Sequence, residues 1–415
     1  MANWAKLQED LVGLPVAKRA RHGIHFQKSA NEFVANFSGK PCHYEDGGIW
    51  KPIDTKLLAT SGGFYGSPHS DVKIHPDGRV KVDKSDYQQF TELPSAKAGV
   101  LSGDRIIRTF PGGEQHLIMK EDGFREEIHV FKPTFPLEKF IAKTQGSLPS
   151  KYKAHPVTAE DADGNTYEFT GDVAAFGKWL DAAKYPVVID PDFTSATGGG
   201  GDTGLSPFSP TRNYGTAITM GTGTVQGAWL LRFDISEIAA GSTPTAASLK
   251  ITKTFATSTG ANTTSIYGVK AANGDWVEGT KYHTDAGAGE PCWDAKKADG
   301  AGGVTTAWAG AEGCQTAGTD YETDAYGSFD WNREDLDGTQ YTITFNAAGI
   351  TCVGTWFGAN TYNYGLIFPT SIRMSSYGRF AASEYATESY RPVLSVTYTA
   401  GGVPKHYLHY ARLRG

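Results

Sequence analysis

Short runs in which apolar and polar residues alternate fill most of this chain, and Gly, Asn or Asp separates one run from the next. Alternation with a period of two gives a strand one apolar face, so the pattern predicts half-buried strands. In residues 72–82, apolar residues flank the turn sequence HPDG (75–78), which predicts a hairpin with Gly at a positive-φ position. Residues 229–235 and 390–398 alternate in the same way.

The composition agrees with this pattern. The chain has 50 Gly among 415 residues, with 12% aromatic and 20% charged residues, a mixture poor in helix formers and rich in turn formers. Two segments, 3–14 and 172–184, carry the spacing of a short amphipathic helix instead. We therefore expect an all-β fold with two short helices.

The length predicts more than one domain. The sequence SATGGGGDTG (195–204) has few side chains that can pack, so we place a domain boundary near residue 191 and interpret the segment as a linker. The glycines in it also fit the spacing of a dinucleotide loop, but no helix is expected to follow. The expected organisation is an N-terminal helical or anchoring segment (1–21), a β-rich N-terminal domain (22–191), a jelly-roll-like β-sandwich (192–400) and a C-terminal arm (401–415).

The net charge of -6 gives no general attraction for polyanions, so neither nucleic acid nor a membrane is an expected partner. The first residues lack the basic-then-apolar run of a signal peptide, and no stretch approaches the roughly 18 apolar residues of a membrane span. We therefore expect the chain to be made and left in the host cytoplasm. A protein that looks extracellular but has no export signal is commonly one that is assembled into a virion and released by lysis, and this is the location that we expect.

Six groups of segments follow one another in order: YPVVIDP (185–191), NYG (213–215) with WLLRFDIS (229–236), AGSTPTAASLKI (240–251), DWVEG (275–279), PCWDAKKADG (291–300) with TAWAGAEGC (306–314), and RPVL (391–394) with VTY (396–398). In this order they resemble the bacterial wall-associated and bacteriophage proteins that carry the β-sandwich domain called DNRLRE. The resemblance covers about half of the chain. It implies a jelly-roll-like sandwich of the carbohydrate-binding type, carried as an appendage on wall proteins and phage particles.

From this resemblance we expect a non-catalytic structural protein of a bacteriophage virion: a fibre, a collar or head appendage, or a decoration protein. A role in adhesion to a host surface polysaccharide is part of that expectation. The alternatives are a carbohydrate-binding adhesin of a bacterial cell surface and a polysaccharide depolymerase. The chain has no H-E-x-x-H or G-x-S-x-G motif, and its 45 acidic residues do not single out a glycosidase pair, so no catalytic residue is nominated.

Six of the nine tryptophans lie in the second half of the chain, where most are expected to pack in a sandwich core. The alternative is that Trp293, Trp308 or Trp356 offers a flat face on which a sugar ring stacks.

The acidic residues of the same region suggest calcium as a candidate cofactor, because hard cations bind oxygen ligands. The candidate ligands are Asp275, Glu278, Asp294 and Asp320. Residues 161–165 also resemble the start of a calcium loop, but Thr166 stands where that loop needs Gly, which favours a plain turn.

Cys292 and Cys314 could close a loop, although free thiols are the simpler expectation for a chain made in the cytoplasm.

Both ends of the chain carry apolar or aromatic residues that a compact monomer would leave exposed: Trp4, Leu7 and Leu11 at the front, and Tyr407 and Tyr410 at the back. Exposed apolar stripes commonly mark contact surfaces, although frayed termini are the alternative. We expect these residues to mediate assembly into a homo-oligomer, with a trimer as the expected form, and contacts with other virion proteins.

Overall fold

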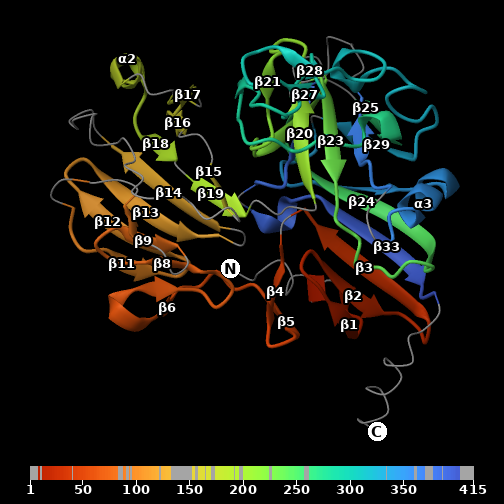
Figure 1. Cartoon of the computed structure of the whole chain (residues 1–415), viewed down its shortest axis with the longest axis horizontal. Helices are drawn as coiled ribbons and strands as arrows, with labels where there is room; N and C mark the ends of the chain where they lie inside the picture. The colour runs from red at the N-terminus through yellow and green to blue at the C-terminus, as the bar shows by residue number, and fades with distance from the viewer. Residues whose placement is uncertain are drawn as a thin grey trace, which may run out of the picture. The chain divides into compact units, whose positions relative to one another are not determined.

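The computed structural model divides the chain into two compact units: unit 1, made of Met1–Pro52 and Gly199–Gly415, and unit 2, made of Ile53–Gly198. Both are built mainly from strands (Figure 1), so the expected all-β fold is confirmed. The structure describes all residues except 1–7, 10–11, 40, 83–86, 90–92, 94–95, 121–122, 132–151, 155–157, 164, 170–172, 191, 196–199, 224–226, 257–260, 333, 359–361, 370–376, 386 and 402–415.

This division differs from the expected domain organisation. Strand β3 (Glu32–Ser38) pairs over its whole length with β33 (Val393–Thr399), so strands from the two ends of the chain share one sheet. Residues 22–52 therefore lie in unit 1, whereas the expected N-terminal domain assigned them to the region 22–191. An alternating pattern shows that a strand has one buried face, but it does not identify the neighbouring strand.

Unit 1 is a sandwich of two antiparallel sheets. The first runs in the order β1 (Val16–Arg19), β2 (Gly23–Gln27), β3, β33, β24 (Thr243–Ala256), β32 (Tyr377–Ala381) and β22 (Thr219–Gly223), with β30 (Gln340–Thr344) paired to β24. The second runs in the order β20 (Gly201–Leu205), β23 (Ala228–Arg232), β31 (Leu366–Phe368), β25 (Ala261–Gly268) and β29 (Gly327–Asn332). A short hairpin, β4 (His43–Asp46) with β5 (Ile49–Pro52), completes the N-terminal segment.

The core of unit 1 lies between these sheets. Trp229 of β23, Leu249 of β24 and Phe380 of β32 are fully buried in it, and the Trp229 ring stacks on Phe368 at a centroid distance of 4.8 Å. Leu230 is also fully buried, in a second cluster on the opposite face of β23. The expected half-buried strand at 229–235 is thus covered on both faces, because loops pack over its outer side.

These loops, residues 206–216 and 269–322, form what we call the loop end of unit 1. They contain the short strands β21 (Arg212–Asn213), β26 (Thr284–Asp285), β27 (Lys297–Ala298) and β28 (Val304–Thr306). β21 pairs with β26, which joins the two loop segments. Figure 1 shows β21, β27 and β28 together beyond one end of β20 and β23. Helix α3 (Ala347–Gly354) contacts β24 and β25.

Unit 2 also contains two main sheets. The larger runs in the order β11 (Val100–Ser102), β12 (Arg105–Phe110), β13 (Gly113–Met119), β14 (Gly123–Val130), β18 (Val187–Asp190), β16 (Thr158–Glu160) and β17 (Thr166–Glu168), while β19 (Asp192–Ser195) pairs with β14 and β15 (Tyr152–Ala154). The smaller runs in the order β10 (Tyr87–Gln89), β9 (Arg79–Val82), β8 (Val72–Ile74), β7 (Tyr65–Gly66) and β6 (Leu58–Ala59). Buried Val72 and Val80 pack with Leu117 and Phe124 between them.

Several local predictions are confirmed. The hairpin at 72–82 is β8 and β9, with Gly78 at φ +99°. Helix α2 (Val173–Ala182) lies within the predicted segment and buries Phe176 and Leu180.

The linker interpretation is wrong for Gly201–Leu205, which form strand β20. Among the described residues, no helix has the length and apolar character that crossing a membrane requires.

Candidate functional site

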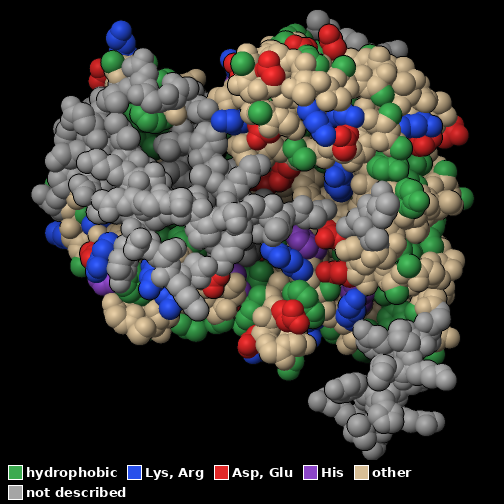
Figure 2. Space-filling view, in the orientation of Figure 1, with side chains coloured by type: hydrophobic (Ala, Val, Ile, Leu, Met, Phe, Trp, Pro, Cys, Tyr) green, Lys and Arg blue, Asp and Glu red, His purple; other side chains and the backbone are tan. Residues whose placement is uncertain are grey.

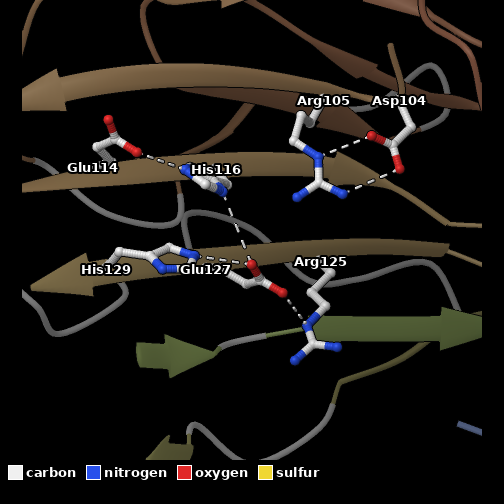
Figure 3. A network of polar contacts seen from close by, with 7 residues as sticks. All are labelled: Asp104, Arg105, Glu114, His116, Arg125, Glu127 and His129. Carbon is white, nitrogen blue, oxygen red and sulfur yellow. Dashed lines mark hydrogen bonds and ion pairs between the residues drawn. The ribbon is translucent and has the colours of Figure 1, made fainter. Parts of the chain in front are cut away.

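One face of the larger sheet of unit 2 carries charged side chains. Along β13 and β14, partly exposed residues alternate with buried ones such as Leu117 and Ile128, as the period of a strand requires. Figure 3 shows the charged side chains of this face together with one from the turn before β12: Asp104, Arg105, Glu114, His116, Arg125, Glu127 and His129.

His116, Glu127 and His129 form a cluster on this face. The strand register places His116 of β13 opposite Glu127 of β14, and His129 lies two residues further along β14. His129 Nε2 lies 3.0 Å from Glu127 Oε2, and His116 Nδ1 lies 4.0 Å from the same oxygen. The two imidazole centroids are 4.3 Å apart. One nitrogen or oxygen from each residue lies within 4.8 Å of the other two.

Neighbouring charges orient these side chains. His116 Nε2 lies 3.1 Å from Glu114 Oε2, which leaves His116 Nδ1 facing Glu127. Arg125 Nε lies 3.2 Å from Glu127 Oε1, the oxygen that is not shared with the histidines. One nitrogen of each imidazole therefore faces the same carboxylate oxygen of Glu127, as the dashed lines in Figure 3 show.

Glu127 is ionised at neutral pH. Its partial burial acts to raise its pKa, but the hydrogen bond with His129 and the nearby positive charges, chiefly Arg125, outweigh burial and lower the pKa to about 2. Arg105, which also contributes to this lowering, is paired with Asp104 at 2.9 Å. Two imidazoles with one carboxylate are a donor set suited to a divalent transition-metal ion.

Unit 1 contains a different cluster, made only of carboxylates. Asp202 of β20, Glu278 of the loop end and Glu384, which follows β32, each offer an oxygen within 4.8 Å of the others. The Asp202 side chain is fully buried, and its Oδ2 accepts a hydrogen bond of 2.8 Å from the backbone N–H of Ser383. Asp202 Oδ1 is buried and has no hydrogen-bond partner among the described residues.

The backbone at this cluster requires glycine. Gly201 has φ +153°, and a Cβ there would lie 2.8 Å from the carboxyl group of Glu278. Burial raises the pKa of Asp202 well above its usual range, and the negative charges of Glu384 and Glu278 raise it further. A raised pKa favours the protonated form of Asp202 when no cation is bound, and the all-oxygen composition of the cluster suits a hard ion such as calcium.

The predicted calcium ligands do not come together as a set, and Asp320 shows why. Its fully buried carboxylate accepts hydrogen bonds from Asn273 Nδ2 at 2.8 Å and from the backbone N–H groups of Gly310, Ala311 and Thr316 at 2.7, 3.1 and 2.8 Å. Both of its oxygens are used in holding the loop. Of the four candidates, Glu278 alone belongs to the carboxylate cluster.

Asp275 is held by ion pairs instead. Its oxygens lie 2.8 Å from Lys296 Nζ and 2.5 Å from Lys297 Nζ. Partial burial acts to raise the pKa of Asp275, but the hydrogen bonds to both lysines outweigh burial and lower it to about 2. Burial, together with the charge of Glu312, raises the pKa of Asp294.

The three candidate tryptophans differ in exposure. Trp356 is 1% exposed in the sandwich core, and Trp308 is 5% exposed and donates from Nε1 to the Cys292 carbonyl at 3.0 Å. Because both residues are buried, neither ring has a free face for a sugar. The expectation that Trp308 or Trp356 forms a sugar-binding platform is therefore wrong. Trp293 is partly exposed, and its ring packs on Gly313, where a Cβ would lie 2.3 Å from it.

Buried polar side chains fix the loop end. Asn213 donates from Nδ2 to the carbonyls of Pro291 and Glu278 at 2.9 and 3.1 Å, and its Oδ1 accepts from the backbone N–H of Gly215 at 2.9 Å. The Arg232 guanidinium lies 4.4 Å from the Trp276 ring centroid. These contacts join segments that are distant in the sequence.

The remaining sequence predictions have mixed outcomes. All four cysteines are free, so Cys292 and Cys314 do not form the considered disulfide. At residues 161–165, Asp161 Oδ1 accepts hydrogen bonds from the backbone N–H groups of Asp163 and Asn165 at 2.9 Å each. These bonds are typical of a turn, as the sequence predicted. The five assembly residues lie outside the described part of the chain.

No protein-family model matches this chain, and no curated protein matches it. The fold itself defines the class, which is an all-β protein with a sandwich-like unit.

Proposed function

We propose that this chain is a non-catalytic structural protein of a bacteriophage particle, a fibre, appendage or decoration protein, in which unit 1 serves adhesion to a host surface polysaccharide. The observation that carries the proposal is that segments bearing the resemblance to DNRLRE proteins contact one another at the loop end. Asn213 hydrogen bonds to Glu278 and Pro291, and Arg232 stacks on Trp276. A sandwich whose long loops are joined to one another at one end has the form of a binding module.

The surface of this region suits an uncharged ligand. On the face drawn in Figure 2, acidic and basic side chains are interspersed over unit 1 among a larger area of uncharged polar side chains and backbone. Of the three candidate tryptophans, Trp293 is the one that is partly exposed to solvent. We expect the exposed part of this residue to offer an apolar surface to a sugar.

The thiols support a role without nucleophilic catalysis. Burial raises the pKa of Cys42, Cys292, Cys314 and Cys352, so none of them is a thiolate at neutral pH. The thiolate is the reactive form of cysteine, so these residues are suited to packing rather than to attack on a substrate.

Protein composition of purified particles tests the virion assignment. We expect peptides of this chain in density-purified phage particles at a fixed ratio to the capsid protein, and antibody labelling at a defined place on the particle. Recovery only from the bacterial envelope would instead support a cell-surface adhesin. Release of reducing ends from host polysaccharide by the purified chain would overturn the non-catalytic assignment.

Two tryptophan variants test adhesion. Trp293→Ala should weaken binding to host polysaccharide by 1–3 kcal/mol, about the cost of losing an aromatic contact, with an unchanged circular dichroism spectrum. Trp308→Ala is the matched control, and we expect it to destabilise unit 1 by about 3–5 kcal/mol because it empties a buried site. Equal polysaccharide affinity for folded Trp293→Ala and the unmodified chain would contradict the adhesive role of that residue.

A further inference from the structure

We propose that His116, Glu127 and His129 of unit 2 bind one divalent transition-metal ion, with zinc as the expected metal. The site is independent of the adhesive role assigned to unit 1. It rests on the geometry of two neighbouring strands, and each ligand comes from the same face of the sheet.

The distances are close to those of a coordination sphere. Zinc binds imidazole nitrogen and carboxylate oxygen at about 2.0–2.2 Å, so ligand atoms in a tetrahedral site lie roughly 3.3–3.5 Å apart. His129 Nε2 and Glu127 Oε2 are 3.0 Å apart, and His116 Nδ1 is 4.0 Å from that oxygen. Small rotations of the side chains would bring all three atoms to bonding distance of one ion.

The nitrogen of His116 that faces the cluster lacks a hydrogen bond. His116 Nδ1 is buried, and no donor or acceptor among the described residues lies within hydrogen-bond distance of it; Glu127 Oε2 is 4.0 Å away. A buried polar atom without a partner is costly, and a metal ion would remove that cost. This observation is separate from the proximity of the three residues.

The surrounding residues form the outer shell that such a site needs. Metal-bound histidines commonly donate their second ring N–H to a carboxylate, which fixes the tautomer. His116 Nε2 lies 3.1 Å from Glu114 Oε2, which leaves Nδ1 as the ligand atom. Arg125 holds the other oxygen of Glu127 at 3.2 Å, so Oε2 is directed to the metal.

The donor set selects the metal. Two imidazoles and one carboxylate favour zinc over calcium, which prefers six to eight oxygen ligands. Three protein ligands leave a fourth position, and the partial exposure of the His129 side chain, 24%, gives water access to it. The bound ion would link β13 to β14 and hold one exchangeable water.

Titration of the full, untagged and chelator-treated chain with Zn²⁺ tests the proposal. Calorimetry should show a zinc site that His129→Ala and Glu127→Gln each remove, and Co²⁺ should give the visible absorption of a tetrahedral complex that both variants lose. Glu114→Gln should weaken zinc binding by about 10–100-fold without abolishing it, because it removes only the outer-shell partner.

His75→Ala is the control, because His75 Nδ1 pairs with Asp77 at 2.7 Å in the same unit but does not belong to the cluster. It should bind zinc like the unmodified chain. Circular dichroism of each variant establishes that it is folded, and Glu114→Gln provides a second measurement if His129→Ala unfolds. Zinc binding that is unaffected by Glu127→Gln and Glu114→Gln, or no zinc binding by the unmodified chain, would overturn the proposal.

Discussion

The carboxylate cluster of unit 1 and the histidine cluster of unit 2 differ in donor type and in burial. Asp202 is fully buried among carboxylates, and its pKa is raised, whereas Glu127 lies beside arginine and histidine side chains and has a pKa lowered to about 2. In the first cluster a cation competes with protons, because the raised pKa of Asp202 favours its protonated form. The second cluster already presents an ionised carboxylate. Similar spacing of three side chains thus gives two different electrostatic states, set by the neighbours.

Asp320 lies outside both clusters and accepts hydrogen bonds within the loop end of unit 1, and Asp320→Ala should have the largest effect on stability. The substitution leaves three backbone N–H groups and the amide of Asn273 without their acceptor. At about 1–3 kcal/mol for each unsatisfied buried group, partly offset by relaxation, we expect a loss on the order of 4 kcal/mol. Urea unfolding measures this loss, with Asp320→Asn as the milder control. A loss below about 1 kcal/mol would return Asp320 to the ligand candidates.

Calcium should act on unit 1 through the carboxylate cluster and not through the histidine cluster. At a calcium concentration 100 times its dissociation constant, stabilisation is about 2.7 kcal/mol by mass action. We expect a rise in melting temperature that Glu278→Gln removes and Glu127→Gln retains. A calcium response that survives Glu278→Gln would show that the ion binds elsewhere.

In the absence of metal, a change of pH should have a smaller effect on the stability of unit 1. Because the pKa of Asp202 is raised in the folded state, protonated Asp202 contributes stability that is complete below the unfolded-state pKa, about 3.9, and is lost as pH rises through the folded-state value. Asp202→Asn stays neutral, so its stability should decline less with rising pH in that range. Parallel pH profiles for the two chains would indicate that Asp202 is not protonated in the fold.

Local structure was predictable from the sequence to a greater extent than either cluster. The hairpin with Gly78 and helix α2 follow from short-range patterns, and the strand period alone puts Arg125, Glu127 and His129 on one face. Placing His116 opposite Glu127 also requires the register between two strands, which the alternation does not specify.

The carboxylate cluster was even harder to predict from the sequence. Asp202 hydrogen bonds to Ser383, 181 positions away, and neither Asp202 nor Glu384 belongs to a recognisable ligand motif. The pairing of β3 with β33 is of the same kind, because Asn36 lies opposite Ser395, 359 positions away. Long-range pairing depends on the whole fold, whereas composition and spacing report on neighbours in the sequence.

The smallest expected effect concerns Asp275, which the sequence suggested as a calcium ligand and which the structure pairs with two lysines. Its carboxylate is 55% exposed, and Lys297 is 35% exposed, so solvent screens the interaction. Lys297→Ala should therefore cost less than about 1 kcal/mol of stability. Asp275→Asn should leave the calcium-induced rise in melting temperature unchanged, because Asp275 does not belong to the carboxylate cluster. Differential scanning calorimetry with and without calcium measures both effects in one experiment. Loss of the calcium response in Asp275→Asn, with Lys297→Ala unaffected, would place the ion at Asp275 and remove the distinction between the two clusters.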